Sequence, residues 1–589
     1  MKLSRSIIIS SVLLFCGTFT SFADEITVTF PASPRFPVFP HGQPIEMTVW
    51  AHRDNPKSED VLTWEIVDFW GRSVTVGVID FAAGKEQTFT KITLNDLPAG
   101  YLSVSAIIKG SSTGLPRRGS RPEGMATFGV LSPVSALPLK SPADSRFGIQ
   151  GTNFIKSGIF LQGDPYEPLY PALGIHWVNV QRSWADAEAD HAGQYQPKDP
   201  VFTGETGYMA NSNLEPLFCV FNLPWWAIDF PSDFRVDHGK GSQRQSFPPK
   251  DYALYGDYLK KMAAHQVAIR KAEANGEPIS FENHYQIGWE PDWHWKGTDE
   301  QFVKLYRTVG EAIHAADPDA MVMGPGDGVL KQAIARLERT LPLGLADGLD
   351  GLAVHGYYTP FGNPLAVEPG DKLISPEDGG VIDSLRKVRS LMREYFKPGA
   401  KLFQTEWGLD YRSTYLDLTT ELLKMHAAYI TRGHLLFLGE GCDMTYFFYT
   451  ADYGNLKHRG EDGYGMCFNL TMPDPSFGAV NISPKPVFMS AATLTRVLEG
   501  TRTLGPVDLG NPGICAYAFQ RGDDVALAVW SRDNESHEVT IPVAGDAVTL
   551  VGFMGNTSAL NAHDGTVTLK ADRYPQYLIG KIPAEKTLR

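Results

Sequence analysis

The hydrophobic and polar positions follow one rhythm in the middle of the chain and another rhythm at both ends. Between residues 145 and 500, short apolar runs alternate with longer segments in which apolar residues recur every three or four positions. Short apolar runs are typical of buried parallel strands, and the longer segments are typical of amphipathic helices. The middle of the chain therefore predicts repeated strand–helix units.

Eight apolar runs qualify as the strands of such units. In chain order they are Phe147–Asn153, His176–Arg182, Pro216–Asn222, Tyr285–Trp289, Ala320–Gly324, Leu349–His355, Lys401–Thr405 and Met444–Tyr449. Helical patterns occupy Asp251–Gln266, Asp299–Ala316, Val329–Leu341, Val381–Tyr395, Leu418–Leu438 and Pro486–Leu498. This count favours a (β/α)8 TIM barrel over residues 145–500. An open doubly wound sheet is the alternative, but it gives no reason for eight strands, and no G-x-G-x-x-G opens a helix.

Both ends of the chain read as β-rich. Residues 24–140 hold short strand patterns separated by turn residues, at Glu46–Ala51, Leu62–Val67, Ser73–Ile79 and Tyr101–Ile108. Residues 501–589 hold similar patterns, at Ile514–Gln520, Val525–Ser531, Glu538–Pro542, Ala547–Val551 and Val567–Leu569. Regular short strands of this kind predict a β-sandwich on each side of the barrel, so the fold class is α/β with flanking β domains.

The first 23 residues are expected to be a signal peptide. Lys2 and Arg5 precede the apolar run Ile7–Phe15, and Ser21 and Ala23 are small residues where a signal peptidase needs them. The run is short for a bilayer, and no later stretch reaches about 18 apolar residues. We therefore expect cleavage after Ala23, secretion to the periplasm or the outside, and no integral membrane segment in the product.

Charge and cysteine content exclude several classes of partner. The formal net charge of −14 becomes more negative once the two bases of the signal are removed, which argues against a nucleic-acid partner. Cys219, Cys442, Cys467 and Cys515 form no C-x-x-C pair, and no H-E-x-x-H, P-loop or EF-hand motif is present. We expect no metal and no cofactor. A disulfide between Cys467 and Cys515 stays open, as does the oligomeric state.

Two carboxylates stand where barrel enzymes carry their chemistry. Glu290 follows the fourth predicted strand and Glu406 follows the seventh, so both belong to the carboxyl-terminal end of the barrel. Cleavage of a glycosidic bond needs two facing carboxyls, one protonated and one ionised. Each Glu could instead cap a neighbouring helix or pair with an arginine. Two of them at strands four and seven, each beside a Trp, favour the catalytic interpretation.

The sequence around these residues resembles the clan A glycoside hydrolases, and family 39-like and family 5-like enzymes most. Glu290-Pro291-Asp292 is similar to the end of their Asn-Glu-Pro motif, and the segment 404–408, Gln-Thr-Glu-Trp-Gly, is similar to their nucleophile strand. The resemblance implies that Glu290 is the general acid/base and Glu406 the nucleophile of a retaining enzyme. Trp289 departs from the pattern, because the family usually has Asn there, in contact with the sugar 2-hydroxyl.

The resemblance also implies supporting roles at other strand ends. An arginine at the position of Arg182 would keep the nucleophile ionised, a tyrosine at Tyr357 would donate to it, and a histidine at His355 would touch the sugar. Two of these residues have a structural alternative: a salt bridge for Arg182, and a core histidine for His355.

Aromatic residues follow several of the predicted strands and suit a carbohydrate substrate. Flat side chains can meet the apolar C–H faces of sugar rings, and packing beneath loops is the alternative use of the same residues. The substrate-binding candidates of this kind are Trp225, Trp293, Trp295 and Trp407.

Together these features predict a secreted retaining glycoside hydrolase that cleaves β-glycosidic bonds of an oligo- or polysaccharide. A non-catalytic glycan-binding protein on a hydrolase fold is one alternative, and a transglycosylase that uses the same carboxylates is another. The sequence does not specify the sugar, the linkage, or whether cleavage is internal or terminal.

Overall fold

The computed structural model describes most of the chain between residues 25 and 583. The described ranges are 25–30, 36–57, 59–81, 85–110, 125–150, 169–188, 190–193, 195, 213–221, 223–234, 247–271, 273–274, 277–278, 283–358, 374–409, 420–451, 464–469 and 482–583. The expected signal peptide, residues 1–23, lies outside the described residues, as do Asn153 and Asn222 at the ends of two predicted strands.

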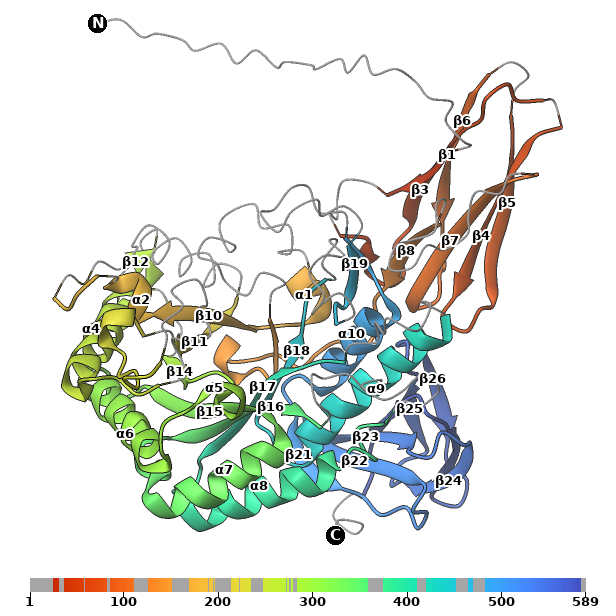
Figure 1. Ribbon diagram of the computed structural model, residues 1–589. Helices are drawn as coiled ribbons and strands as arrows, with labels where there is room; N and C mark the ends of the chain where they lie inside the picture. The colour runs from red at the N-terminus through yellow and green to blue at the C-terminus, as the bar shows by residue number, and fades with distance from the viewer. Residues whose placement is uncertain are drawn as a thin grey trace, which may run out of the picture.

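Eight parallel strands close into a barrel (Figure 1). They are β9 (Phe147–Gln150), β10 (Trp177–Ser183), β11 (Glu215–Phe221), β14 (His284–Ile287), β15 (Met321–Val329), β16 (Gly351–Tyr357), β17 (Lys401–Trp407) and β18 (Met444–Phe448). The last strand pairs with the first, with Phe447 opposite Ile149, and this pairing closes the ring. The eight predicted strands and the TIM barrel are thus confirmed.

Helices cover the outside of the barrel (Figure 1). The longest are α4 (Tyr252–Lys271), α6 (Asp299–Ala316), α7 (Leu330–Thr340), α8 (Val381–Tyr395), α9 (Thr420–Gly439) and α10 (Pro486–Leu498). Local signals explain where some begin: Thr298 and Gln301 form a capping box at α6, and Pro486 occupies the first turn of α10. Short helices that the sequence did not predict are α1 (Leu169–Leu173), α2 (Trp184–Ala187) and α5 (Pro291–His294).

The N-terminal region is a β-sandwich of two sheets. One sheet contains β1 (Glu25–Thr29), β3 (Ile45–His52) and β6 (Gln87–Leu94). The other contains β2 (Val38–Phe39), β8 (Met125–Val130), β7 (Gly100–Ile108), β4 (Val61–Asp68) and β5 (Ser73–Asp80). Alternate residues of β3, such as Met47 and Val49, face Leu62 and Val104 in a shared core, as period-two patterning requires.

The C-terminal region is a second β-sandwich. Its larger sheet contains β21 (Arg502–Pro506), β22 (Ile514–Arg521), β23 (Asp524–Ser531), β28 (Gln576–Gly580), β25 (Ala547–Val551) and β26 (Thr557–Asn561). A two-stranded sheet of β24 (His537–Pro542) and β27 (Thr566–Ala571) covers its core, which includes Leu527, Val529, Ile541 and Leu578. Both predicted sandwiches are therefore present on either side of the barrel in the sequence.

Polar contacts join the three parts of the molecule. Arg432 of α9 donates from Nε to Oε1 of Glu377 at 3.0 Å, and the Trp530 indole N–H of β23 donates to the same oxygen at 2.7 Å. Asn556 binds the backbone of Ala99 through both ends of its amide, at 3.0 and 2.8 Å. The last bonds join the two sandwiches directly, across 457 positions of sequence.

Two further observations concern membrane-spanning helices and disulfide bonds. Among the described helices, none has the length and apolar character needed to cross a membrane. Cys219, Cys442, Cys467 and Cys515 are all buried, and the part of the chain that the structure describes contains no disulfide between Cys467 and Cys515.

Candidate active site

The structure brings the two predicted carboxylates together at the carboxyl-terminal end of the barrel. Glu290 comes shortly after β14, and Glu406 lies near the end of β17. One oxygen of each carboxylate and one ring nitrogen of His355 all lie within 4.8 Å of one another. The Glu406 side chain is 9% exposed and that of Glu290 is 23% exposed, so Glu406 is the deeper of the two.

Two residues of β16 contact the carboxylates. Nδ1 of His355 is 3.1 Å from Oε1 of Glu290 and 3.7 Å from Oε2 of Glu406. The Tyr357 hydroxyl donates to Oε1 of Glu406 at 2.9 Å. Gly356 between them has a φ of +95°, and a side chain there would meet the ring of Phe437. Glycine adopts this φ readily and leaves room for Phe437. Gly356 therefore allows both His355 and Tyr357 to face the carboxylates.

Gln150 is a site residue that the sequence analysis missed. Its amide, at the end of β9, donates to Oε2 of Glu406 at 2.9 Å. With Tyr357 on the other oxygen, each oxygen of Glu406 accepts one hydrogen bond from a neutral donor. A signal was present in the sequence, because Gln150 is a polar residue that closes an apolar strand run, as Glu290 and Glu406 do.

Burial and neighbouring charges shift the pKa values of Glu406 and His355. Burial raises the pKa of Glu406 to about 7; the charge of His355 and the bonds from Gln150 and Tyr357 act against it, and Glu290 acts with it. Although burial lowers the pKa of His355, the two carboxylates raise it above its usual value. Near neutral pH the Glu406 carboxyl is therefore only partly ionised.

Tyr357 keeps its proton throughout the physiological range. Burial, together with the charges of Glu406 and Glu290, raises the pKa of Tyr357 well above its ordinary value. The hydroxyl is therefore a permanent hydrogen-bond donor to Glu406 and not a second base.

Glu290 has an unusual backbone conformation. Its φ of 46° and ψ of 53° place it in the left-handed region, which costs a residue with a side chain about 1–3 kcal/mol. Its N–H donates to the carbonyl of Gly326 in β15 at 3.0 Å. Non-glycine residues in this region cluster at functional sites.

Trp289, which stands where the family pattern has Asn, turns its indole toward His355. The two ring centroids are 4.6 Å apart at an interplanar angle of 62°. The indole packs at a steep angle against the imidazole that contacts both carboxylates, and it cannot reproduce the two hydrogen-bonding groups of an amide.

Arg182 lies deeper than the carboxylates. It is 4% exposed, and its guanidinium lies 4.9 Å from the centre of the Phe218 ring. Burial raises the pKa of the Cys219 thiol, with Glu406 acting in the same direction and Arg182 in the opposite one. The charges of Arg182 and Glu406 therefore both act on the pKa of this buried thiol, in opposite directions.

The four predicted aromatic candidates have different environments. Trp293, in α5, is 42% exposed. Trp295 packs edge-on against Phe302, and Trp225 stacks on Phe230 with ring centroids 5.5 Å apart. Trp407 is fully buried, packed against two residues of α9, His434 and Phe437. Trp293 is the one that offers the most open surface to a ligand.

Two groups of described residues bring three possible metal ligands within 4.8 Å of one another. One is Glu290, His355 and Glu406, and the other is His52, Asp54 and Glu86 on the N-terminal sandwich. In the first group, Glu406 already accepts bonds at both oxygens and His355 approaches Glu290 at hydrogen-bonding distance. This arrangement suits proton sharing between acids at least as well as it suits a cation.

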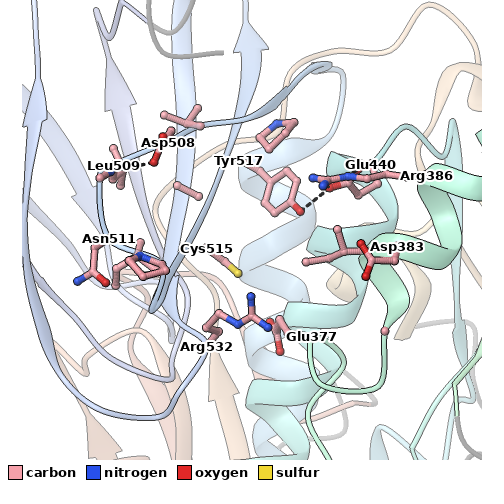
Figure 2. Close-up of a pocket in the computed structure, with 18 residues that line it drawn as sticks. Glu377, Asp383, Arg386, Glu440, Asp508, Leu509, Asn511, Cys515, Tyr517 and Arg532 are labelled. Carbon is pink, nitrogen blue, oxygen red and sulfur yellow. Dashed lines mark hydrogen bonds and ion pairs between the residues drawn. The ribbon is translucent and has the colours of Figure 1, made fainter. Parts of the chain in front are cut away.

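A hollow of about 880 Å³ lies between the barrel and the C-terminal sandwich (Figure 2). On one wall Arg386 binds both oxygens of Glu440, at 2.9 and 2.8 Å, and the Tyr517 hydroxyl donates to Glu440 at 2.8 Å. The charges of Arg386 and Glu440 neutralise each other. The hollow is a joint between two parts of the molecule, and it is separate from the carboxylate pair.

Comparisons with known proteins support the fold. No protein-family model matches the chain. A curated β-xylosidase from Caldicellulosiruptor saccharolyticus is 23% identical over 305 residues, which cover 50% of this chain and 56% of that protein. The chain thus spans little more than half the length of this relative.

Solved structures resemble three quarters or more of the chain. A family 39 glycoside hydrolase from the gut symbiont Bacteroides cellulosilyticus WH2 aligns with 94% of this chain and all of its own, with a TM-score of 0.63 and 16% identity. A conserved exported protein from Bacteroides fragilis aligns with 76% of this chain and 98% of its own, with a TM-score of 0.50 and 11% identity. The predicted resemblance to clan A glycoside hydrolases is confirmed at the level of the fold.

Proposed function

We propose that this protein is a retaining glycoside hydrolase that cleaves a β-glycosidic bond, with Glu290 as general acid/base and Glu406 as nucleophile. The observation that carries the proposal is the carboxylate pair, whose nearest oxygens lie within 4.8 Å. Retaining glycosidases hold their carboxyls about 5–5.5 Å apart, whereas inverting enzymes leave about 6.5–9.5 Å for a water molecule. An upper limit of 4.8 Å between the nearest oxygens is well below the inverting range and close to the retaining one, which supports a retaining mechanism.

In the first step, an oxygen of Glu406 attacks the anomeric carbon and forms an ester bond to it. The bond from that carbon to the leaving oxygen breaks, and Glu290 gives its proton to this oxygen. In the second step, Glu290 takes a proton from water, the water oxygen attacks the same carbon, and the ester bond breaks. Glu406 leaves as a carboxylate, Glu290 is protonated again, and two inversions give overall retention.

The surroundings support this division of roles. Glu406 receives hydrogen bonds from Gln150 and Tyr357, and such bonds stabilise the ionised form that a nucleophile needs. Glu290 is the more exposed carboxylate, which suits a group that must reach both a leaving oxygen and a water molecule. His355 lies between them and can balance negative charge as it moves from one carboxyl to the other.

We propose a β-linked xyloside as the first substrate to test, because the curated relative is named a β-xylosidase. The experiment is a panel of aryl β-glycosides and β-linked oligosaccharides with wild type, Glu290→Gln and Glu406→Gln. We expect each variant to lose at least about 100-fold in kcat/KM on a substrate with a poor leaving group. A 2-fluoro glycoside should label Glu406, and mass spectrometry of peptides would locate the label.

Glu338→Gln is the matched control, because Glu338 pairs with Lys387 on the surface and both side chains are 48% exposed. It should retain full activity. Near-wild-type rates in Glu290→Gln or Glu406→Gln would overturn the assignment of that residue. Retention itself is tested by NMR of the first-formed product, and an inverted anomer would contradict the double displacement.

We also propose that the protein is exported after removal of residues 1–23. Support comes from the basic start, the apolar run and the small residues before Asp24. Expression in a Gram-negative host, fractionation and N-terminal sequencing should find a mature chain that begins at Asp24. An intact N-terminus in the cytosol would contradict the proposal.

A further inference from the structure

We infer that the end of strand β15 positions the acid/base: Gly328 provides the space that the Glu290 carboxylate occupies, and Asp292 ties the loop that carries Glu290 to this strand. This inference rests on the function proposed above and assigns it two positioning residues. Neither residue is required to contact the substrate, because both act through the placement of Glu290.

Hydrogen bonds tie the Glu290 loop to β15 along its length. The Glu290 N–H donates to the Gly326 carbonyl at 3.0 Å. Further along, the two oxygens of Asp292 accept one backbone N–H each, from Gly328 and Val329, both at 3.1 Å. One carboxylate thus binds two consecutive amides of the strand. Hydrogen bonds to a charged acceptor are the stronger kind, so the loop is held where they form.

Gly328 lies directly against the acid/base. A Cβ at this position would lie 2.7 Å from Oε1 of Glu290, 3.0 Å from the indole nitrogen of Trp293 and 3.3 Å from Oδ2 of Asp292. The backbone of Gly328 is not in the left-handed region, so alanine is compatible with its conformation. The absent side chain is therefore explained by the space that the Glu290 carboxylate needs, not by backbone geometry.

Oε1 of Glu290, the atom nearest Gly328, is also the oxygen that His355 contacts at 3.1 Å. Gly328 on one side and His355 on the other thus confine this oxygen. A methyl group at residue 328 has to push the carboxylate away from one of its contacts. A displacement of about 1 Å in a reacting group can cost about 100-fold in rate.

The chemistry supplies a specific test of this displacement. A proton from Glu290 matters for a sugar leaving group, whose oxygen is strongly basic, and matters little for 2,4-dinitrophenolate, which leaves without assistance. In Gly328→Ala we expect kcat/KM for the disaccharide to fall about 10- to 100-fold and that for the dinitrophenyl glycoside to change less than about threefold. Both substrates carry the glycosyl group that the panel above identifies.

Gly256→Ala is the matched control. It adds the same methyl group in helix α4, where the nearest atoms would be at an ordinary 3.5 Å. Its rates on both substrates should equal those of wild type. Asp292→Asn should show the same dependence on the leaving group as Gly328→Ala, with a smaller loss, because its amide nitrogen cannot accept the second backbone N–H.

Equal losses on both substrates in Gly328→Ala, or no loss on either, would overturn the inference. A crystal structure of this variant gives a measurement that does not depend on turnover. An unmoved Glu290 carboxylate would overturn the positioning role even if the proposed function were correct. A displaced carboxylate, in a protein whose wild type cleaves no glycoside, would support the positioning role while the proposed function fails.

Discussion

At the residue scale, the Glu406 carboxylate is held from two sides. Gln150 and Tyr357 each donate to one of its oxygens, and both donors are neutral at the pH of interest. Neutral donors stabilise the negative charge without adding a cation that would have to be separated from it when the ester forms. This arrangement leaves His355 as the titratable cation that balances the pair.

Tyr357→Phe should lower kcat/KM about 10- to 100-fold. The change removes a donor to a buried charged group, and such a bond is worth about 1.5–3 kcal/mol. Steady-state kinetics on the same glycoside would measure the loss. Tyr358→Phe removes the hydroxyl of the next residue, which donates to the Ile374 carbonyl and not to either carboxylate. Equal kinetics in the two variants would contradict the role given to Tyr357.

The pH profile should have a rising limb near neutrality. Because burial raises the pKa of Glu406 to about 7, this carboxyl carries a proton below this pH and loses it above. A protonated carboxyl cannot attack the anomeric carbon, so kcat/KM should rise as pH rises through about 7, by up to about tenfold per unit at its steepest. Measurement from pH 4 to 9 would reveal the limb. A constant rate up to pH 9 would contradict it.

Four residues of this carboxylate site could be predicted because each stands at or just beyond the end of an apolar strand run: Glu290, Glu406, His355 and Tyr357. The left-handed backbone of Glu290 could not, because Glu has no preference for it and tertiary hydrogen bonds impose it.

Trp407 was a candidate for substrate binding because it follows Glu406 in the sequence, but its side chain does not face the carboxylate site. Successive residues of a strand point to opposite faces, so the neighbour of inward-facing Glu406 faces the helix layer, where Trp407 is fully buried.

At the scale of elements, helix α9 supports the strand that carries Glu406. Gly433 in this helix faces the indole of Trp407 in β17, and a Cβ there would overlap the ring. The two elements approach so closely because one residue has no side chain and the other fills the space. The placement of Glu406 therefore depends on helix packing as well as on its own strand.

Gly433→Ala should lower stability, although alanine is the better helix former. The clash with Trp407 forces helix and strand apart. Overpacking of this kind costs about 1–3 kcal/mol, and over most of that range the cost is larger than the gain of about 1 kcal/mol in helix propensity. Thermal unfolding followed by circular dichroism would show a lower Tm. Gly256→Ala, where no such contact exists, should raise the Tm or leave it unchanged. A raised Tm in both variants would contradict the packing argument.

Elements with strong periodicity could be predicted to the residue. The bounds of α6, α8 and α10 match the expectation. Amphipathic spacing marks α6 and α8, a capping box marks the start of α6, and a first-turn proline marks the start of α10. The short helix α5 could not be predicted, because four residues carry no periodicity. The strand β6 was not predicted either. Its residues are alternately exposed and half-buried, so its two faces differ little in hydrophobicity.

At the scale of the whole molecule, a buried ion pair joins the barrel to the C-terminal sandwich. The side chains of Glu377 and Arg432 are both fully buried, and Trp530 of the sandwich donates to the same carboxylate. Nothing in the local sequence predicts this pairing, because the partners are distant in the chain and charged residues usually indicate surface.

Glu377→Gln should destabilise the protein by about 3–5 kcal/mol, because it leaves the guanidinium of Arg432 buried without a counter-charge. The double variant Glu377→Gln with Arg432→Met removes both charges and should recover part of the loss. Denaturant unfolding of wild type, single and double variants would measure the coupling. Additive losses in the double variant would contradict a direct interaction.

The bonds between Asn556 and Ala99 connect segments 457 positions apart. A ribosome that adds about 5–20 residues each second needs roughly 20–90 seconds to synthesise the intervening chain. During that interval the first sandwich exposes the surface it will later share with the last one. Newly made protein is therefore most vulnerable to proteases and to wrong associations before its final segment emerges, and shortening the chain from its carboxyl end would prolong that vulnerability indefinitely.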